Sequence, residues 1–310
     1  MQKVDIVQYL LLKPTEPIPY NLREIISCIP ENEHKLQSQV YDEQGYINKV
    51  PKKFSIKEWT NKRITQKIIY YIAYNEDKLV GSISFFLNPQ SPNLYYDYDA
   101  KDAYHISQIY VDSDHRGIGI GKQLMLLAEN CVKQTGYKKI DLKTSYSNFK
   151  AQSMYNELGY KVKFASLSLD ITKYDITKVT PLKLLYHLDN NMNQLIINDL
   201  VERQSYYNNG FSLKDLKNNL ITKLENRSFG IFYNQSCDTY CLWCISTNSI
   251  YNSLTIFSIF GDVRSMLDSL AKYISVKDIY TITITVSSND IDKYLYYGFE
   301  GKMLHLVKFL

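Results

Sequence analysis

Apolar and polar residues alternate between residues 105 and 111, a pattern that is typical of a half-buried β-strand. Regular alternation divides the side chains between two faces of this strand, with Ile106, Gln108 and Tyr110 on one and Ser107, Ile109 and Val111 on the other. After Lys122 the apolar positions recur at helical spacing, at Leu124, Leu127, Ala128, Cys131 and Val132. The pattern predicts an amphipathic helix that ends near Gly136, because glycine readily adopts the left-handed cap conformation.

The same patterns predict strands and helices along the whole chain, and therefore a mixed α/β fold (α+β) in which helices flank a central mixed sheet. Strands are predicted at residues 1–13, 68–75, 78–87, 140–144, 164–171, 228–233, 239–247, 253–260 and 279–286. Helices are predicted at residues 20–29, 55–67, 194–204, 213–225 and 263–274, with shorter ones after residues 148 and 290.

The second half of the chain repeats the order of elements in the first half. Tyr294 stands four residues before Gly298, just as Tyr155 stands four residues before Gly159. We interpret this correspondence as a degenerate internal repeat. It predicts two tandem domains, residues 1–176 and 177–310.

Three glycines at alternating positions, Gly117, Gly119 and Gly121, join the strand at 105–111 to the helix that follows. Without Cβ atoms they let a ligand come close to the backbone, and the loop amides converge on the positive end of the helix dipole. The pattern predicts an anion site, most simply for a phosphate. A Walker loop is excluded because Lys122 is followed by Gln123, and the glycine spacing of the dinucleotide fingerprint is also absent.

This loop resembles the acetyl-CoA loop of the GNAT acyltransferase superfamily, whose signature is Gln/Arg-x-x-Gly-x-Gly/Ala, with Arg116, Gly119 and Gly121 at the defined positions. The preceding Tyr110, Val111 and Asp112 also match the family's pattern at the end of its fourth strand. A second motif of the family, Asn-x-x-Ala-x-x-x-Tyr-x-x-x-Gly-Phe/Tyr, is matched by Asn148, Ala151, Tyr155, Gly159 and Tyr160. The resemblance covers roughly residues 60–170 and identifies the first copy as a GNAT-like domain.

The resemblance implies acetyl-CoA as co-substrate and no metal. Its pyrophosphate is expected at the glycine loop, and its pantetheine arm is expected to add to the strand edge by main-chain bonding. Where the fourth strand splays from the fifth, a backbone N–H near Ile109 or Val111 would polarise the thioester carbonyl. The predicted cofactor-binding residues are Ile109, Tyr110, Val111, Arg116, Gly117, Ile118, Gly119, Ile120, Gly121, Lys122 and Asn148, the last of these also as a helix N-cap.

Tyr155 is the predicted catalytic residue, as the general acid that protonates the departing thiolate. An ordinary phenol, with a pKa of about 10, is a reasonable match for a thiol with a pKa of about 8.5. Many family members carry a carboxylate base on the fourth strand, but Ser107 and Gln108 occupy those places here. His105 and Asp112 are the nearest titratable groups, and a water relay is a third possibility, so the base stays unassigned.

The second copy lacks the loop. The segment 256–263 carries one glycine, Gly261, and no arginine, and Asp262 stands where an anion would have to sit. Like charge would oppose a pyrophosphate there. We therefore expect this half not to bind acetyl-CoA in the way of the family, and to serve as a scaffold, as a wall of the acceptor cleft or as a partner-binding surface.

Composition indicates the general class of protein. The 310 residues are 45% hydrophobic and 22% charged with a net charge of +4, which indicates a globular protein and gives no indication of nucleic-acid or membrane binding. No signal-peptide core or membrane span is predicted, so a cytoplasmic location is expected, with leaderless export left open. The spacing of Cys237, Cys241 and Cys244 has some likeness to a zinc site, but core thiols are the preferred interpretation.

The sequence leaves the acceptor open. In the loop at 88–102, Asp97, Asp99 and Asp102 stand among tyrosines and could recruit a cationic amine, although a solvated acidic loop is the commoner arrangement. The predicted function is transfer of acetyl from acetyl-CoA to a primary amine by direct attack in a ternary complex, the acceptor being a small molecule or a protein or peptide. The alternative is a non-catalytic acyl-CoA sensor or adaptor, for example a bacterial effector that acts through a protein partner.

Overall fold

The computed structural model describes eleven segments of the chain: residues 4–10, 68–75, 78–87, 103–177, 181–185, 196–202, 212–225, 229–234, 238–247, 252–275 and 279–310. The predicted helices at 20–29 and 55–67, the acidic loop at 88–102 and Cys237 lie outside them. Two compact units divide the chain. The first comprises Met1–Pro89, Asp102–Lys161 and Leu306–Leu310, and the second comprises Gln90–Lys101 and Val162–His305.

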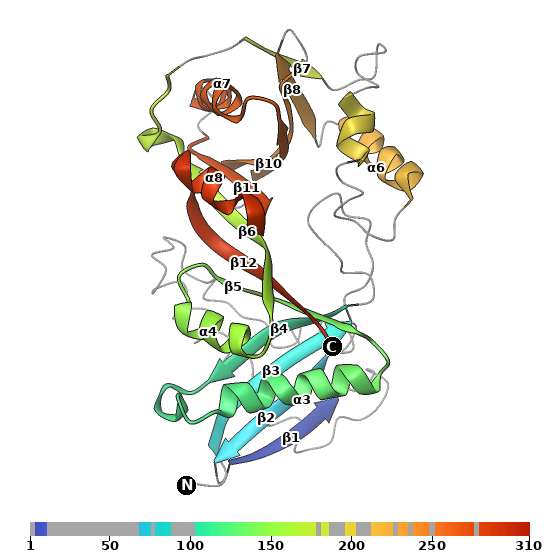
Figure 1. The fold of residues 1–310 in the computed structure, drawn as a ribbon, viewed down its shortest axis with the longest axis vertical. Helices are drawn as coiled ribbons and strands as arrows, with labels where there is room; N and C mark the ends of the chain where they lie inside the picture. Colours follow the sequence, from blue (N-terminus) through green and yellow to red (C-terminus); the bar gives the residue numbers. More distant parts are fainter. Residues whose placement is uncertain are drawn as a thin grey trace. The chain divides into compact units, whose positions relative to one another are not determined.

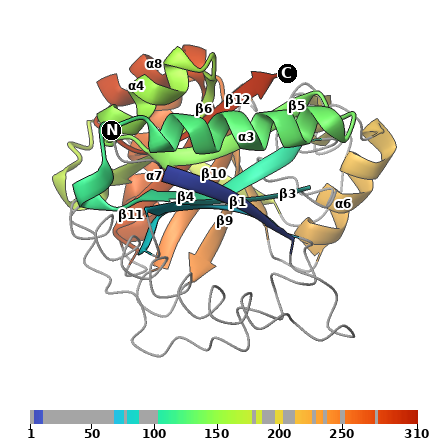
Figure 2. The same ribbon diagram turned by 90° about the horizontal axis from the view of Figure 1, so that it is seen from below.

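A mixed sheet forms the first unit, with its strands in the order β1-β2-β3-β4-β5. The strands up to β4 are antiparallel to their neighbours, whereas β5 is parallel to β4. Helices α3 and α4 lie on the same face of this sheet (Figures 1 and 2). The elements are β1 (Val4–Leu10), β2 (Ile69–Asn75), β3 (Lys78–Leu87), β4 (Tyr104–Val111), the 3₁₀ turn η1 (Ser113–His115), α3 (Ile120–Gln134), β5 (Lys139–Ser145) and α4 (Phe149–Glu157).

Helix α3 forms and packs where its apolar spacing predicts. Its buried residues include Ile120, Leu124, Met125, Ala128 and Val132, all at most 2% exposed, which is the stripe of an amphipathic helix. A Cβ on Gly81 of β3 would lie 3.2 Å from Ile120 Cγ2 and 3.4 Å from Leu124 Cδ1, so the start of the helix sits directly on the sheet. Gly136 ends the helix region with φ +82°, as expected for a left-handed cap.

The predicted alternation in β4 is wrong at one position. The register passes from Ser84↔Gln108 to Phe85↔Ile106, so Ser107 is an extra residue, and its hydroxyl bonds the Ser84 hydroxyl at 2.7 Å. Because of this β-bulge, Ile106 shares a face with Ile109 and Val111 instead of with Gln108 and Tyr110. The sequence prediction assumed a regular pleat. The bulge shifts the alternation by one residue, so the residues before it face the side of the sheet opposite to the one predicted.

The second unit contains a mixed sheet with the strand order β6-β11-β10-β9-β8-β7. β10 and β11 are parallel, and the other neighbouring pairs are antiparallel. Its elements are β6 (Lys161–Asp170), the 3₁₀ turn η2 (Ile171–Lys173), β7 (Leu182–Leu185), α6 (Leu213–Glu225), β8 (Gly230–Asn234), β9 (Tyr240–Thr247), β10 (Asn252–Phe260), α7 (Val263–Ser275), β11 (Thr281–Ser287), the 3₁₀ turn η3 (Ser288–Asp290), α8 (Ile291–Tyr296) and β12 (Glu300–Phe309). Residues 196–202 are also helical.

The order of elements confirms the repeat inferred from the sequence. β8-β9-β10-α7-β11-α8-β12 follows the same order as β2-β3-β4-α3-β5-α4-β6. The sequence prediction included no strand after Phe299, whereas β12 runs from Glu300 to Phe309. The compact units are discontinuous, since β6 falls mostly in the second unit and Leu306–Leu310 falls in the first. The division at residue 176 into a cofactor-binding and a degenerate domain stays a prediction.

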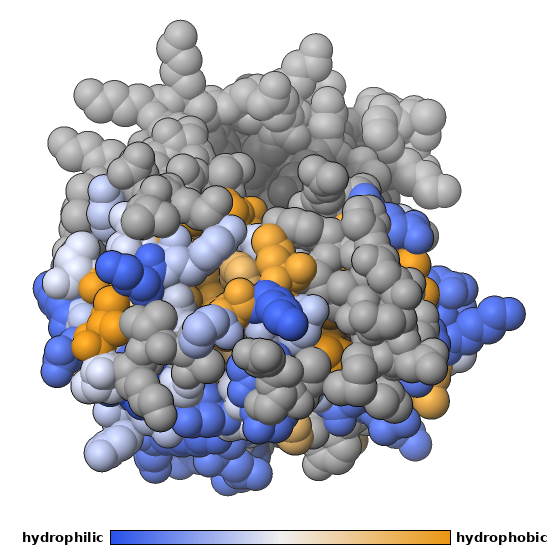
Figure 3. All heavy atoms as spheres, turned by 90° about the horizontal axis from the view of Figure 1, so that it is seen from above, coloured by the Kyte–Doolittle hydropathy of each residue, from blue (hydrophilic) through white to orange (hydrophobic). Residues whose placement is uncertain are grey.

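The core of the second unit is apolar and well enclosed. A cluster of buried side chains extends from the helical residues 196–202 through α6 to β8, β9 and β10, and Cys241 and Cys244 of β9 are both buried. Burial raises the pKa of the Cys241 thiol. On the surface, apolar residues appear in small groups between hydrophilic ones (Figure 3). Among the described residues, no helix has the length and apolarity needed to span a membrane.

Candidate functional site

The loop from β4 to α3 contains two backbone conformations that favour glycine. Asp112 accepts a hydrogen bond from Asp114 N at 3.1 Å and so starts the η1 turn. The chain then passes through Gly117 at φ +83° and Gly119 at φ +93°, both in the left-handed region. A side chain there would strain the backbone. The glycines are therefore required by the turn itself, before any ligand is considered.

The N-terminus of α3 faces open space. A Cβ on Gly117 or on Gly119 would meet no atom within 4 Å. Gly119 is the N-cap residue of α3 and supplies no side-chain hydrogen bond to its first turn, which also contains no acidic residue. The free N–H groups and the positive end of the helix dipole are thus left for an outside anion.

Gly121 serves a different purpose from the other two glycines. It lies inside α3, where a Cβ would stand 3.3 Å from Met154 Sδ of α4 and 3.6 Å from Val111 Cγ2 of β4. Gly121 therefore lets α3 pack closely on its neighbours. Of the three regularly spaced glycines, Gly117 and Gly119 are needed for the left-handed backbone and Gly121 is needed for close packing.

Strands β4 and β5 part beside this loop. Their parallel ladder pairs Tyr104–Ile106 with Ile140–Leu142, although β4 continues to Val111 and β5 to Ser145. The splay that the sequence analysis expected near Ile109 and Val111 is present. Arg116 folds back over this end of the strand, and its Nε donates to Val111 O at 3.0 Å.

The remaining predicted cofactor residues differ in burial and in their partners. Ile118 is exposed, whereas Ile120 is buried against the sheet. Tyr110 is nearly buried, and desolvation raises the pKa of its phenol. Lys122 is exposed, with its Nζ 3.6 Å from Glu157 Oε2 of α4. Asn148 caps α4 through its side-chain oxygen, which accepts from Ala151 N at 3.3 Å.

Tyr155 lies on the buried face of α4 with 4% of the residue exposed. Its ring meets the Tyr160 ring edge-on, with the centroids 6.0 Å apart. Burial raises the pKa of the Tyr155 phenol to about 12. The phenol thus stays protonated at neutral pH, but proton transfer to a thiolate becomes less favourable by roughly 3 kcal/mol than it would be from an ordinary phenol.

The two candidate bases have different surroundings. The Asp112 carboxylate is used as the cap of η1. His105 Nδ1 lies 2.7 Å from Asp141 Oδ1 of β5, and both side chains are about one-fifth exposed. The sequence analysis missed Asp141. The available signal was a polar residue between Ile140 and Leu142, but only the β4–β5 register shows that it stands beside His105.

The equivalent helix start in the second unit is closed by the protein itself. Asp262 accepts from Ser265 N at 3.1 Å and so caps α7, and Asp262 N donates to Thr239 Oγ1 at 3.1 Å. A Cβ on Gly261 would fall 2.3 Å from Asp238 O. The expected obstacle at Asp262 is therefore confirmed, and the backbone of residues 238–239 adds a second one.

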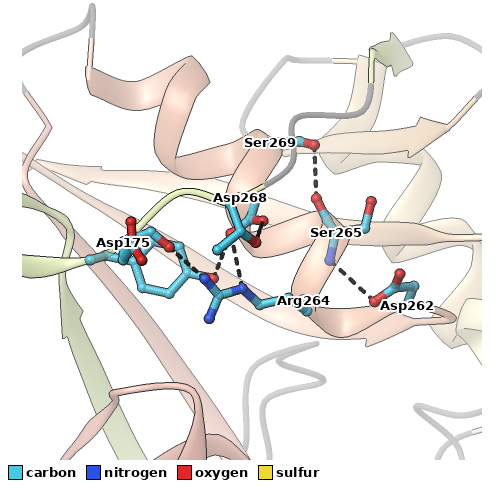
Figure 4. A network of polar contacts seen from close by, with 8 residues as sticks. Asp175, Asp262, Arg264, Ser265, Asp268 and Ser269 are labelled. Carbon is cyan, nitrogen blue, oxygen red and sulfur yellow. Dashed lines mark hydrogen bonds and ion pairs between the residues drawn. The ribbon is translucent and has the colours of Figure 1, made fainter.

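In the first two turns of α7, Arg264 pairs with the buried Asp268 (Figure 4). Arg264 Nε lies 3.2 Å from Asp268 Oδ1, its guanidinium donates to Asp175 O, and its Cζ is 4.8 Å from the centre of the Tyr174 ring. Asp268 is fully buried and also accepts from Tyr174 and Thr177 hydroxyls at 2.9 and 2.8 Å. These contacts tie the first two turns of α7 to residues 174–177.

Residues 34–160 match the family model described as "Acetyltransferase (GNAT) family". This part of the chain is similar to the GNAT family. This agrees with the resemblance seen in the glycine loop and in the α4 motif.

Two curated human relatives match the same domain. N-acetyltransferase 8B is 32% identical and N-acetyltransferase 8 is 27% identical, each over 92 residues, or 30% of this chain. The chain spans 38% of the length of either relative. A crystal structure of a GCN5-related N-acetyltransferase from Sphaerobacter thermophilus aligns with 98% of this chain and 95% of its own, with a TM-score of 0.57 and 9% identity. That likeness shows the fold, and it extends over both halves of the chain.

Proposed function

We propose that this protein transfers acetyl from acetyl-CoA to a primary amine by direct attack within a ternary complex. The observation that carries the proposal is the uncapped N-terminus of α3, reached through two left-handed glycines, next to the splayed end of β4. In this proposal, the open helix start is the anion site and lies next to an open strand edge. A thioester attached to a pyrophosphate requires that combination.

Acetyl-CoA would lie along the loop and the end of β4. The pyrophosphate is held by backbone N–H groups between Arg116 and Lys122, including those of Gly117, Ile118, Gly119, Ile120 and Gly121. The pantetheine arm adds to the edge of β4 at Ile109, Tyr110 and Val111. Asn148 fixes the start of α4 beside it.

The chemistry follows from this placement. A backbone N–H near Ile109 or Val111 polarises the carbonyl, which stabilises the oxyanion as the amine attacks. The C–S bond then breaks, and the sulfur takes a proton from the Tyr155 hydroxyl. The raised pKa of Tyr155 keeps that proton in place until the thiolate forms.

For the amine's proton we propose His105, assisted by Asp141. Their 2.7 Å contact fixes one imidazole nitrogen and orients the ring, whereas the Asp112 carboxylate is already used as a cap. His105 precedes Ile109 by four residues, so its proton would arrive through water. The acceptor is a small amine, or an amine of a protein or peptide.

One observation favours a second function, an acyl-CoA sensor or adaptor without turnover. Burial widens the gap between the pKa of Tyr155, about 12, and that of a departing thiol. A site with such a weak acid would bind acetyl-CoA without transferring the acetyl group efficiently.

The deciding experiment is thiol release from acetyl-CoA by the purified chain, with polyamines, aminoglycosides, amino acids and lysine or N-terminal peptides as acceptors. Gly119→Asp runs beside it as the control. Turnover with one acceptor class that disappears in Gly119→Asp supports a transferase and names its substrate type. Tight CoA binding with no turnover on any class favours the sensor.

A further inference from the structure

The end of β12 lies against α3 and against the turn that follows α4, the helix that carries the predicted acid. Leu306–Leu310 belong to the first compact unit, and Leu310 N donates to Lys138 O at 2.8 Å. This segment brings Lys308 to α3, where Lys308 Nζ donates to Glu129 Oε2 at 2.6 Å. The two charged groups are separated by 179 residues of sequence.

This ion pair is enclosed. The Glu129 side chain is 3% exposed and the Lys308 side chain is 19% exposed. A buried carboxylate is costly unless it is paired and hydrogen-bonded, so Lys308 is required by Glu129 as long as Glu129 is charged. The pair fixes the position of the Lys308 side chain far more firmly than an exposed pair would.

Lys308 crosses the turn that ends α4. A Cβ on Gly159 would lie 3.8 Å from Lys308 Cε, and Lys308 Nζ stands 5.6 Å from the centre of the Tyr160 ring. Tyr160 is 1% exposed. Its burial is the main cause that raises the pKa of its phenol, and the charge of Glu129 is the second. The lysine, the carboxylate and this ring form one contact group, which we name the α4 clamp (Glu129, Lys308 and Tyr160).

The α4 clamp reaches Tyr155 by two contacts. Tyr160 N donates to Tyr155 O at 2.9 Å, and the two rings meet edge-on at 6.0 Å. A displacement of Tyr160 therefore moves both the backbone and the ring of Tyr155. None of the clamp residues belongs to the predicted cofactor-binding set.

We propose that Lys308 is a positioning residue for acetyl transfer, which holds Tyr155 in place through Glu129 and Tyr160. The inference rests on the proposed role of Tyr155 as the acid. It makes the last residues of the chain a working part of the first copy's active site, and it predicts that losing Lys308 lowers kcat without weakening CoA binding.

The test is a double-mutant cycle between Lys308→Met and Tyr155→Phe, with kcat, KM for acetyl-CoA and the Kd of CoA measured for each variant. Lys308→Met should lower kcat about tenfold in the wild-type background, since small misplacements of a catalytic group are costly. In the Tyr155→Phe background, kcat should change less than about twofold because no acid is left to position. The Kd of CoA should stay unchanged throughout.

Two further variants separate positioning from stability. Lys302→Met removes a lysine from the same strand, one that pairs with Glu300 at an exposed position, and should leave every constant unchanged. Glu129→Gln with Lys308→Met leaves no charge buried alone, so it should fold like the wild type while kcat remains low. Recovery of full kcat in this double variant would overturn the proposal.

The outcomes distinguish the inference from the function on which it rests. Equal losses of kcat from Lys308→Met in both backgrounds, or no loss in either, would overturn the positioning role alone. A Tyr155→Phe variant with wild-type kcat would overturn the assignment of the acid itself.

Discussion

Helices α3 and α7 start at equivalent points of the two copies, but they satisfy their first N–H groups in opposite ways. At α3, Gly119 leaves the helix end without a side-chain cap and facing open space. At α7, Asp262 caps the helix with its own carboxylate, and residues 238–239 press against Gly261. The same order of elements therefore leaves the helix start open in one copy and closed in the other.

The difference lies in where the negative charge comes from. The first N–H groups of any helix need acceptors, and a negative charge there is favourable. The second copy carries that charge in its own chain at Asp262, whereas the first turn of α3 contains no acidic residue, and we propose that a ligand supplies the charge there. Four predictions test this comparison, from the largest expected effect to the smallest.

Gly119→Asp should weaken CoA binding by about 100-fold or more, because its carboxylate repels the pyrophosphate at short range. Gly119→Asn is the matched control, since asparagine has a similar shape, tolerates the left-handed conformation and carries no charge. It should cost about tenfold or less by the same reasoning. Calorimetric titration with CoA measures both. Equal losses in the two variants would show that shape, and not charge, closes the site.

Gly261→Ala should destabilise the fold by about 3 kcal/mol, because the new methyl group overlaps Asp238 O and the left-handed backbone is strained. Gly119→Ala meets the same backbone strain in open space and should cost about 1 kcal/mol. Denaturant unfolding of both variants measures the difference. Equal stability losses would contradict the contrast between a packed and an open turn.

Tyr155→Phe should lower kcat by about 10- to 100-fold with little change in CoA affinity, because the hydroxyl acts on the thiolate. Tyr294→Phe is the matched control in the second copy, where a buried tyrosine holds the same place in α8, and kcat should not change. Steady-state kinetics with the best acceptor measure both. A similar loss of kcat in both variants would remove the special role of Tyr155.

The pH profile sharpens this third prediction. An acid works while protonated and is lost as the pH rises through its pKa. Burial raises the pKa of Tyr155 to about 12. At every pH up to about 10 this phenol is therefore protonated, and its titration should cause no loss of the wild-type kcat in that range. An alkaline fall centred below pH 10 that is absent in Tyr155→Phe would contradict the raised pKa of this phenol while still identifying it as the acid.

Asp262→Ala should destabilise the fold by about 1 kcal/mol through loss of the α7 cap. It should not create a CoA site, because residues 238–239 still cover the helix end. Thermal unfolding of this variant measures the loss of stability, and CoA titration measures whether a second site is present. A second CoA site in Asp262→Ala would show that the aspartate alone closes the second copy.

Local patterns predicted much of this fold. The spacing of apolar residues placed α3, the motif placed α4, and the predicted helix at 213–225 coincides with α6. The strand alternation failed at Ser107, because a β-bulge depends on the neighbouring strand and leaves no mark in the period of a single strand. The glycine spacing indicated the anion site, although it did not show that Gly121 serves packing.

Contacts between residues that are far apart in the chain could not be predicted from the sequence. Asp141 stands beside His105 only through the β4–β5 register, and Glu129 meets Lys308 only because the end of β12 lies in the first unit. A glutamate on a predicted helix is most often solvent-exposed, so its burial could not be expected. Such pairings depend on the folded topology.

The most direct test of the account is the number of CoA molecules bound per chain, measured by calorimetry on the wild type and on Gly119→Asp. The account predicts one site per chain in the wild type and none in Gly119→Asp, because the start of α3 is open to a pyrophosphate and the start of α7 is closed. Two sites of equal affinity, or one site that survives Gly119→Asp, would contradict it.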